Sequence, residues 1–220
     1  MLPSMRVINF FGGPGSGKTT AAAGLFHELK KRWAAVEMAS EYAKDLILNG
    51  ESRQLSQQIM VFANQEMRLD RLRADYDWAI TDAPLLLSAF YAPRAYPPSY
   101  RRLVLDMFES YDNVNIFVRR SHAYKPEGRI QREERHADRL AEQIEAFLAG
   151  LGFPYISMSA SDASPACLTA WLQDQGWLPP APPTRPQPPI MAVHQGHGDA
   201  TRRAVTLRDL FPDLAVPVTG

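Results

Sequence analysis

A glycine-rich stretch near the start of the chain has the residue types and the spacing of a phosphate-binding loop. Residues 12–20 read Gly-Gly-Pro-Gly-Ser-Gly-Lys-Thr-Thr, which fits the pattern G-x-x-x-x-G-K-[ST]. Backbone N–H groups of such a loop converge on an oxyanion, and the positive end of the following helix strengthens the attraction. The lysine of the pattern, Lys18, reaches the β- and γ-phosphates of a nucleotide, and the hydroxyl of Thr19 binds Mg²⁺. The expected phosphate-binding residues are Gly12, Gly13, Pro14, Gly15, Ser16, Gly17, Lys18, Thr19 and Thr20.

Two acidic residues follow apolar segments and are candidates to complete this site. Asp82 closes the segment 77–82, where a carboxylate can hold Mg²⁺ directly or through water; the alternative is a helix N-cap. Glu41 follows the segment 34–39, at the sheet edge where open α/β folds bind ligands. Its carboxylate can take the proton of an acceptor hydroxyl, or it can be a capping or surface residue. We predict that Asp82 binds the metal with Thr19 and that Glu41 is the general base.

A loop rich in cations follows the segment 113–119 and could close over a triphosphate to stabilise the transferring charge. Its cations are Arg119, Arg120, Lys125, Arg129, Arg132 and Arg135. We predict catalytic roles for Arg119, Arg120 and Arg129, together with Lys18 and Glu41. Glutamates surround the last two arginines, which favours a salt-bridged helix face for them. A further segment, 91–102, mixes tyrosines with arginines and is either a platform for a base or a proline-rich cover.

The strands and helices that must position these residues are indicated by apolar segments that alternate with amphipathic ones along the chain. Strands are expected at about 5–11, 34–39, 77–82, 113–119 and 153–158. Helices are expected directly after the loop and at about 42–48, 54–73, 85–91, 99–110, 131–149 and 166–175. This alternation predicts an α/β protein with the P-loop NTPase three-layer fold, in which helices flank a five-stranded parallel sheet.

Composition limits the remaining choices. Residues 178–189 contain seven prolines, so we expect a P-loop domain over 1–177 and a Pro-rich, mostly disordered tail over 178–220. Lys plus Arg and Asp plus Glu both number 24, so the chain has no net positive charge that would attract nucleic acid. The single cysteine, the N-terminus without signal-peptide character and the lack of a long apolar run favour the cytoplasm and no membrane.

The motifs resemble the nucleoside- and nucleotide-kinase branch of P-loop proteins, the thymidylate-kinase-like enzymes, and in particular phage kinases of 5-hydroxymethyluracil in DNA. The resemblance runs through residues 11–19, 40–46, 80–86 and 111–129. It implies an ATP-dependent kinase that uses Mg²⁺ and transfers the γ-phosphate to a hydroxyl of a nucleic-acid base, in the host cytoplasm if the protein is encoded by a phage. The implied partners are ATP and an acceptor nucleotide or hydroxymethylated DNA, and a homodimer stays open.

Two alternatives remain, because a phosphate-binding loop by itself does not separate ATPases, GTPases and kinases. One is a kinase of a free nucleoside, a nucleoside monophosphate or nicotinamide riboside. The other is a regulatory P-loop ATPase that transfers phosphate to water. The zero net charge departs from a typical DNA-binding protein and counts against the DNA substrate.

Overall fold

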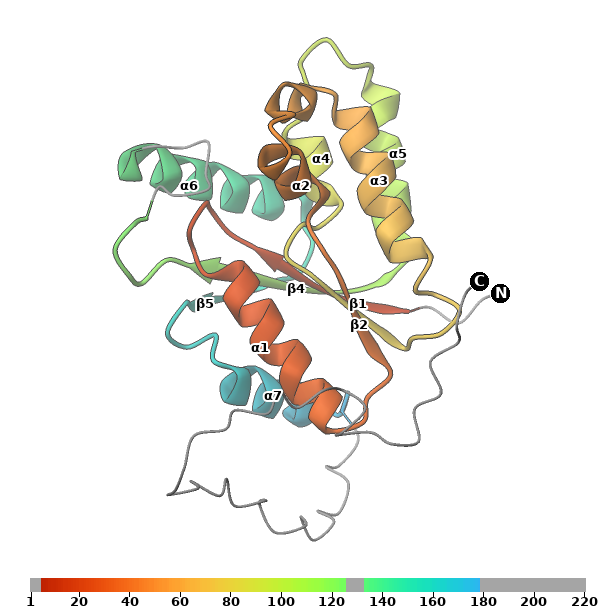
Figure 1. The fold of residues 1–220 in the computed structure, drawn as a ribbon, viewed down its shortest axis with the longest axis vertical. Coiled ribbons are helices and arrows are strands. Elements are labelled where there is room, and N and C mark those ends of the chain that lie inside the picture. Colours follow the sequence, from red (N-terminus) through yellow and green to blue (C-terminus); the bar gives the residue numbers. More distant parts are fainter. Residues whose placement is uncertain (1–4, 126–132, 179–220) are drawn as a thin grey trace, which may run out of the picture. The chain divides into compact units, whose positions relative to one another are not determined.

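The computed structural model describes residues 5–125 and 133–178, in which five strands form one parallel sheet. The spatial order is β2-β3-β1-β4-β5 (Figure 1). The strands are β1 (Arg6–Phe11), β2 (Val36–Ala39), β3 (Trp78–Thr81), β4 (Asp112–Arg119) and β5 (Ile156–Ser159). The expected parallel sheet of five strands is confirmed.

Helices cover both faces of this sheet. Helices α1 and α7 lie against one face, and α3, α4, α5 and α6 lie on the other side (Figure 1). The helices are α1 (Lys18–Lys31), α2 (Tyr42–Leu48), α3 (Gln58–Asp70), α4 (Leu86–Phe90), α5 (Pro98–Glu109), α6 (Glu134–Leu151) and α7 (Pro165–Asp174), with a 3₁₀ helix η1 at Ser52–Ser56. The three-layer α/β fold expected from the sequence is therefore confirmed.

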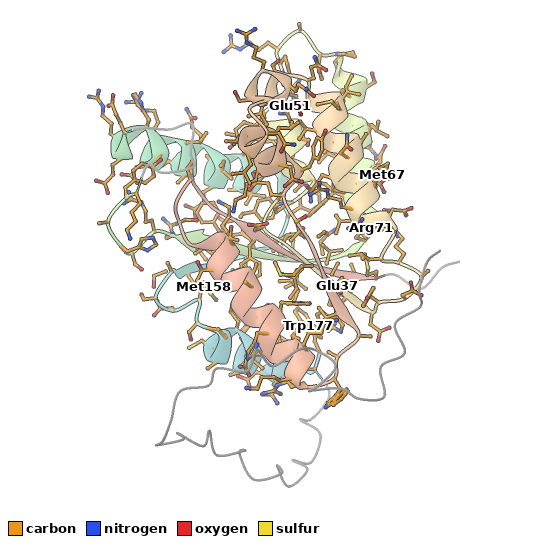
Figure 2. The ribbon with its side chains drawn as sticks, in the orientation of Figure 1. Glu37, Glu51, Met67, Arg71, Met158 and Trp177 are labelled. Carbon is orange, nitrogen blue, oxygen red and sulfur yellow. The ribbon has the colours of Figure 1, made fainter. Side chains whose placement is uncertain are left out.

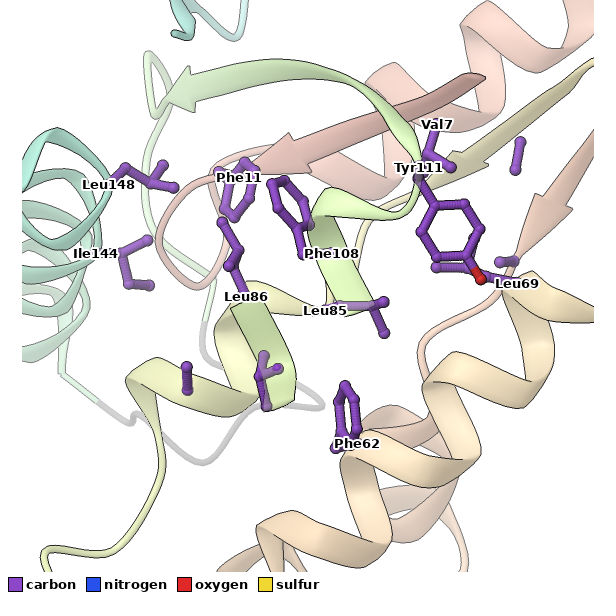
Figure 3. Packing of buried hydrophobic residues seen from close by; sticks show 14 of the residues in the cluster. Val7, Phe11, Phe62, Leu69, Leu85, Leu86, Phe108, Tyr111, Ile144 and Leu148 are labelled. Carbon is purple, nitrogen blue, oxygen red and sulfur yellow. The ribbon is translucent and has the colours of Figure 1, made fainter. Parts of the chain in front are cut away.

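The central strand β1 is buried on both faces, as its sequence predicts, since it is apolar apart from Arg6 and Asn9. Val7 and Phe11 belong to the core under α3 to α6, whereas Ile8 and Phe10 belong to the core under α1 and α7. Figure 3 shows the first of these cores, with Phe11 beside side chains from α4 and α5. The buried Asn9 satisfies its amide through the carbonyl of Val7 and two asparagines of β4.

The strand order decides which loops share a site. Ala39 of β2 lies opposite Thr81 of β3, and Thr81 lies opposite Asn9 of β1. The carboxyl ends of β2, β3 and β1 are thus neighbours in that order. The carboxyl end of β4 lies on the other side of β1. This topology brings Glu41 and Asp82 to one side of the glycine-rich loop and Arg119 to the other.

The predicted long helix over 54–73 is divided in the structure. The backbone of Gln57 is not helical (φ −87°, ψ 69°), so η1 ends before α3 begins. Two apolar residues of this segment, Ile59 and Met67, are 58% and 63% exposed (Figure 2 labels Met67 on α3). The buried stripe of α3 instead contains Gln58, Val61, Phe62, Gln65 and Leu69. Two of the five buried positions of α3 are therefore polar.

The core under α1 and α7 includes one residue beyond the expected end of the domain at residue 177. Leu178 is 9% exposed and packs in the core under α1 and α7. The rest of the predicted tail, residues 179–220, lies outside the described residues, so the division into a domain and a tail stays a prediction. Among the described helices, none is both long and apolar enough to cross a lipid bilayer.

Candidate functional site

The glycine-rich loop joins β1 to α1 and packs directly against neighbouring elements. Gly12 has a φ of 142°, and a Cβ there would lie 2.4 Å from the carbonyl oxygen of Val118 on β4. A Cβ on Gly13 would lie 2.6 Å from the Cβ of Ala141 on α6. Side chains at these two positions would push the loop away from β4 and α6. The glycines therefore let the loop backbone lie close to the sheet edge.

Lys18 and Thr19 connect the start of α1 to the rest of this edge. The Lys18 Nζ donates to the carbonyl oxygens of Gly12 and Gly13, both at 2.9 Å. The Thr19 hydroxyl donates to the carboxylate of Asp82, which is 5% exposed. The next helix, α4, begins at Leu86, so Asp82 is too early in the chain to cap it. The two predicted metal ligands are therefore in direct contact, and the capping alternative for Asp82 loses its support.

The chemistry of this pair fits Mg²⁺. A carboxylate and a hydroxyl are hard oxygen donors, and Mg²⁺ is usually held by one or two protein oxygens together with phosphates and water. In the described part of the chain, no group of three or more His, Cys, Asp or Glu side chains could hold a metal by itself. Thr19 and Asp82 thus suit a metal that is shared with a bound nucleotide, whose charge it would neutralise.

A cavity of about 610 Å³ opens beside the loop, within the range of small-molecule sites. The loop residues Gly12 and Pro14 to Thr20 form one part of its wall, and Asp82 with Ala83 and Pro84 adjoins them. Residues from α2, η1, α3 and α4 form the other part. They are Glu41, Ala43, Lys44, Ile47, Leu48, Leu55, Ser56, Gln58, Val61, Gln65, Leu87, Ser88 and Tyr91. Space for a second ligand therefore adjoins the phosphate-binding loop.

Glu41 lies in this cavity at the start of α2. It occupies the N-cap position, but its side chain forms no capping hydrogen bond. Burial, and then the negative charge of Asp82, raise the pKa of Glu41, although Lys18 and Lys44 act in the opposite direction. Burial and the charge of Glu41 raise the pKa of Tyr91 to about 12. A partly buried carboxylate on which both Lys18 and Asp82 act electrostatically is suited to accept a proton next to a bound nucleotide.

The cavity also contains residues that the sequence analysis did not select. Gln58 and Gln65 are 6% and 4% exposed and lie on the buried stripe of α3. Lys44 and Ser88 contribute further polar groups from α2 and α4. The signal for the two glutamines was present in the sequence, because a polar residue on the apolar stripe of an amphipathic helix needs a partner or a ligand.

Arg119 and Arg120 lie on the other side of the loop, in ion pairs with α6. Arg119 contacts Glu145 at 2.5 Å, and Arg120 pairs with both Glu134 and Asp138. These arginines line a second hollow of about 210 Å³, which reaches Gly13, Pro14 and Ser16 of the loop. Neither arginine is among the residues that line the cavity with Glu41. The third predicted arginine, Arg129, lies outside the described residues.

The segment 91–102 is mostly structural. Tyr91 lines the cavity, but Tyr100 is buried and its hydroxyl donates to the carbonyl oxygen of Gln58 at 2.8 Å. Arg101 donates to the carbonyl oxygen of Ala92, and Arg102 pairs with an aspartate of its own helix. Tyr91 is therefore the aromatic residue of this segment that can contact a ligand in the cavity.

Comparison with known proteins agrees with this fold. A family model described as an AAA domain, AAA_28, matches residues 7–164. No curated protein matches the chain. One similar solved structure is the thymidylate kinase from Ehrlichia chaffeensis, 16% identical, with 71% of this chain and 88% of that chain covered and a TM-score of 0.49. Another is the NadR protein in complex with NAD and AMP-PNP, 15% identical, with 78% of this chain covered and a TM-score of 0.55.

The alignment covers 50% of the NadR chain, and at this identity the likeness concerns the fold alone. The P-loop nucleotide-kinase-like fold expected from the sequence is confirmed. Neither similar structure is described as a phage or hydroxymethyluracil kinase, so that substrate stays a prediction. Since the family model covers more than half of the chain, the protein belongs to the AAA_28 family of AAA domains.

Proposed function

We propose that the protein is a kinase that transfers the γ-phosphate of ATP to a hydroxyl group of a small acceptor bound in the 610 Å³ cavity. The observation that carries this proposal is the position of Glu41, which lines the same cavity as Lys18 and Asp82. A regulatory ATPase needs no second ligand site next to its phosphate loop. The NadR structure, which was solved with the ATP analogue AMP-PNP and with NAD, supports a two-ligand arrangement.

The residues of the cavity divide the work of such a transfer. The loop N–H groups and Lys18 hold the phosphates, and Thr19 with Asp82 would hold Mg²⁺, which neutralises charge on the phosphates. Glu41 accepts the proton of the acceptor hydroxyl while the oxygen of that hydroxyl forms a bond to the γ-phosphorus. The bond between this phosphorus and the bridging oxygen breaks, and ADP carries away the electron pair. Arg119 and Arg120 remain proposed contributors that would need to leave their ion pairs with α6.

The acceptor that best suits the described wall is uncharged. Apolar side chains such as Ile47, Val61 and Leu87 line the acceptor part, together with neutral amides and hydroxyls. Among the described lining residues the cations are Lys18 and Lys44. An acceptor that carries its own phosphate would add negative charge beside Glu41 and Asp82. We therefore favour a free nucleoside or a similar riboside over a nucleoside monophosphate.

A base in duplex DNA would have to leave its stack to reach this cavity, which costs free energy and calls for contacts to the DNA backbone. The 5-hydroxymethyluracil substrate implied by the resemblance is thus the second choice. The test uses γ-labelled ATP and Mg²⁺ with nucleosides, their monophosphates, DNA that contains 5-hydroxymethyluracil, and unmodified DNA. We expect label on a free nucleoside. Label on the modified DNA alone would reverse the preference, and label released only as inorganic phosphate would refute the kinase.

A further inference from the structure

The backbone on both sides of Glu41 is held by one buried side chain of α3. The Gln65 Oε1 accepts a hydrogen bond from the N–H of Tyr42 at 2.9 Å, and the Gln65 Nε2 donates to the carbonyl oxygen of Ser40 at 3.2 Å. The reverse orientation of this amide would set donor against donor and oxygen against oxygen, so the geometry allows one orientation. Gln65 thus bridges the two residues that flank Glu41.

Arg68, one turn further along α3, also binds the segment around Glu41. Its Nη1 donates to the carbonyl oxygen of Ser40 at 3.1 Å and to the Ser40 hydroxyl at 2.8 Å. Its Nη2 contacts the carboxylate of Asp45 on α2 at 2.5 Å, and the guanidinium lies 5.2 Å from the ring centre of Tyr42. Both lone pairs of the Ser40 carbonyl are therefore used by α3.

From this geometry we propose that Gln65 is a positioning residue for Glu41 and that Arg68 stabilises the same backbone segment, residues 40–42. The Glu41 side chain forms no capping hydrogen bond, so its direction depends on the backbone at residues 40 and 42. Gln58 and Val61 of the same helix line the acceptor part of the cavity. An acceptor bound in the cavity would therefore contact α3, the same helix that positions Glu41. This inference rests on the proposed kinase function.

The test compares Gln65→Ala with Asn64→Ala, its neighbour on α3, whose amide donates to the Met60 carbonyl of the same helix. Gln65→Ala should lower kcat at least tenfold, leave the KM for ATP within about twofold, and speed amide hydrogen exchange at Tyr42. Asn64→Ala should change none of these. In a Glu41→Gln background, Gln65→Ala should cause no further loss of kcat, because its effect passes through Glu41.

The outcomes separate this inference from the function on which it rests. An active wild type whose kcat is unchanged in Gln65→Ala would overturn the positioning role alone. Additive losses in the double variant would also overturn it, since they would indicate a general structural effect. A wild type that transfers no phosphate to any acceptor would overturn the proposed function and this inference together. Faster exchange at Tyr42 with a matched loss of kcat would support it.

Discussion

The hydroxyl of Thr19 donates a hydrogen bond to the carboxylate of Asp82, which joins the first turn of α1 to the end of β3. The contact is possible because β3 lies directly beside β1 in the sheet, so their carboxyl ends meet. These two side chains would hold a shared Mg²⁺ through their oxygen atoms, Thr19 as a neutral hydroxyl and Asp82 as a carboxylate.

Replacing Asp82 by Asn tests this metal role. The amide keeps the size of the side chain but removes its charge, so the apparent affinity for Mg²⁺ in the transfer reaction should fall about tenfold or more. The measurement is a Mg²⁺ titration of the transfer rate. Asp77→Asn is the matched control, because Asp77 is an exposed aspartate that directly precedes the other end of the same strand. An unchanged titration in Asp82→Asn would exclude Asp82 as a ligand.

Replacing Glu41 by Gln tests the general base. Loss of a general base typically costs about 10²–10⁴-fold in rate, whereas the binding of ATP should change little. Steady-state kinetics and a direct ATP-binding measurement separate the two quantities. Glu51→Gln, at an exposed position directly before η1, serves as the control. Equal kcat values for wild type and Glu41→Gln would return Glu41 to a structural role.

The raised pKa of Glu41 also predicts how stability depends on pH. Burial and Asp82 make the native state bind a proton at Glu41 more tightly than the unfolded chain does. This contribution is fully present below the ordinary glutamate pKa and is lost as the pH rises through the raised value. Glu41→Gln should therefore raise the Tm relative to wild type more at pH 7 than at pH 4. Thermal unfolding at both pH values measures this, and an equal shift at both would contradict it.

Replacing Gly13 by Ala tests the close contact between the loop and α6. The added Cβ would lie 2.6 Å from Ala141 and 3.0 Å from the carbonyl oxygen of Ala137, so we expect destabilisation of about 1–3 kcal/mol and weaker binding of ATP. Gly150→Ala is the control, because nothing lies within 4 Å of a Cβ there. Chemical denaturation measures both variants. Unchanged stability in Gly13→Ala would mean that α6 can move away at little cost.

Much of the fold could be predicted from the sequence because the strands are short apolar segments between polar turns. The helix at Tyr42–Leu48 begins and ends where the sequence predicts. The division before α3 could not be predicted, because the backbone at Gln57 is non-helical although neither Gly nor Pro occurs in residues 51–60. The exposure of Ile59 and Met67 could not be predicted either, because it depends on which side of α3 packs against the core.

The candidate site was only partly predictable for a topological reason. The loop motif and the two carboxylates lie at strand ends, so a parallel sheet brings them to one edge whatever the strand order. Which side of the loop each residue occupies depends on the order β2-β3-β1-β4, which the sequence does not reveal. Arg119 and Arg120 therefore came to lie beside α6, and the bridging role of Gln65 needed the packing of α3 against residues 40 and 42.

The most direct test of the central claim measures where the γ-phosphate goes. With the best acceptor present, the ADP formed is compared with the inorganic phosphate released, for wild type, Glu41→Gln and Lys18→Ala. The account predicts that wild type transfers nearly all phosphate to the acceptor, that Glu41→Gln loses this transfer while still binding ATP, and that Lys18→Ala forms no ADP although it stays folded. Equal amounts of ADP and inorganic phosphate from wild type, whatever the acceptor, would contradict it.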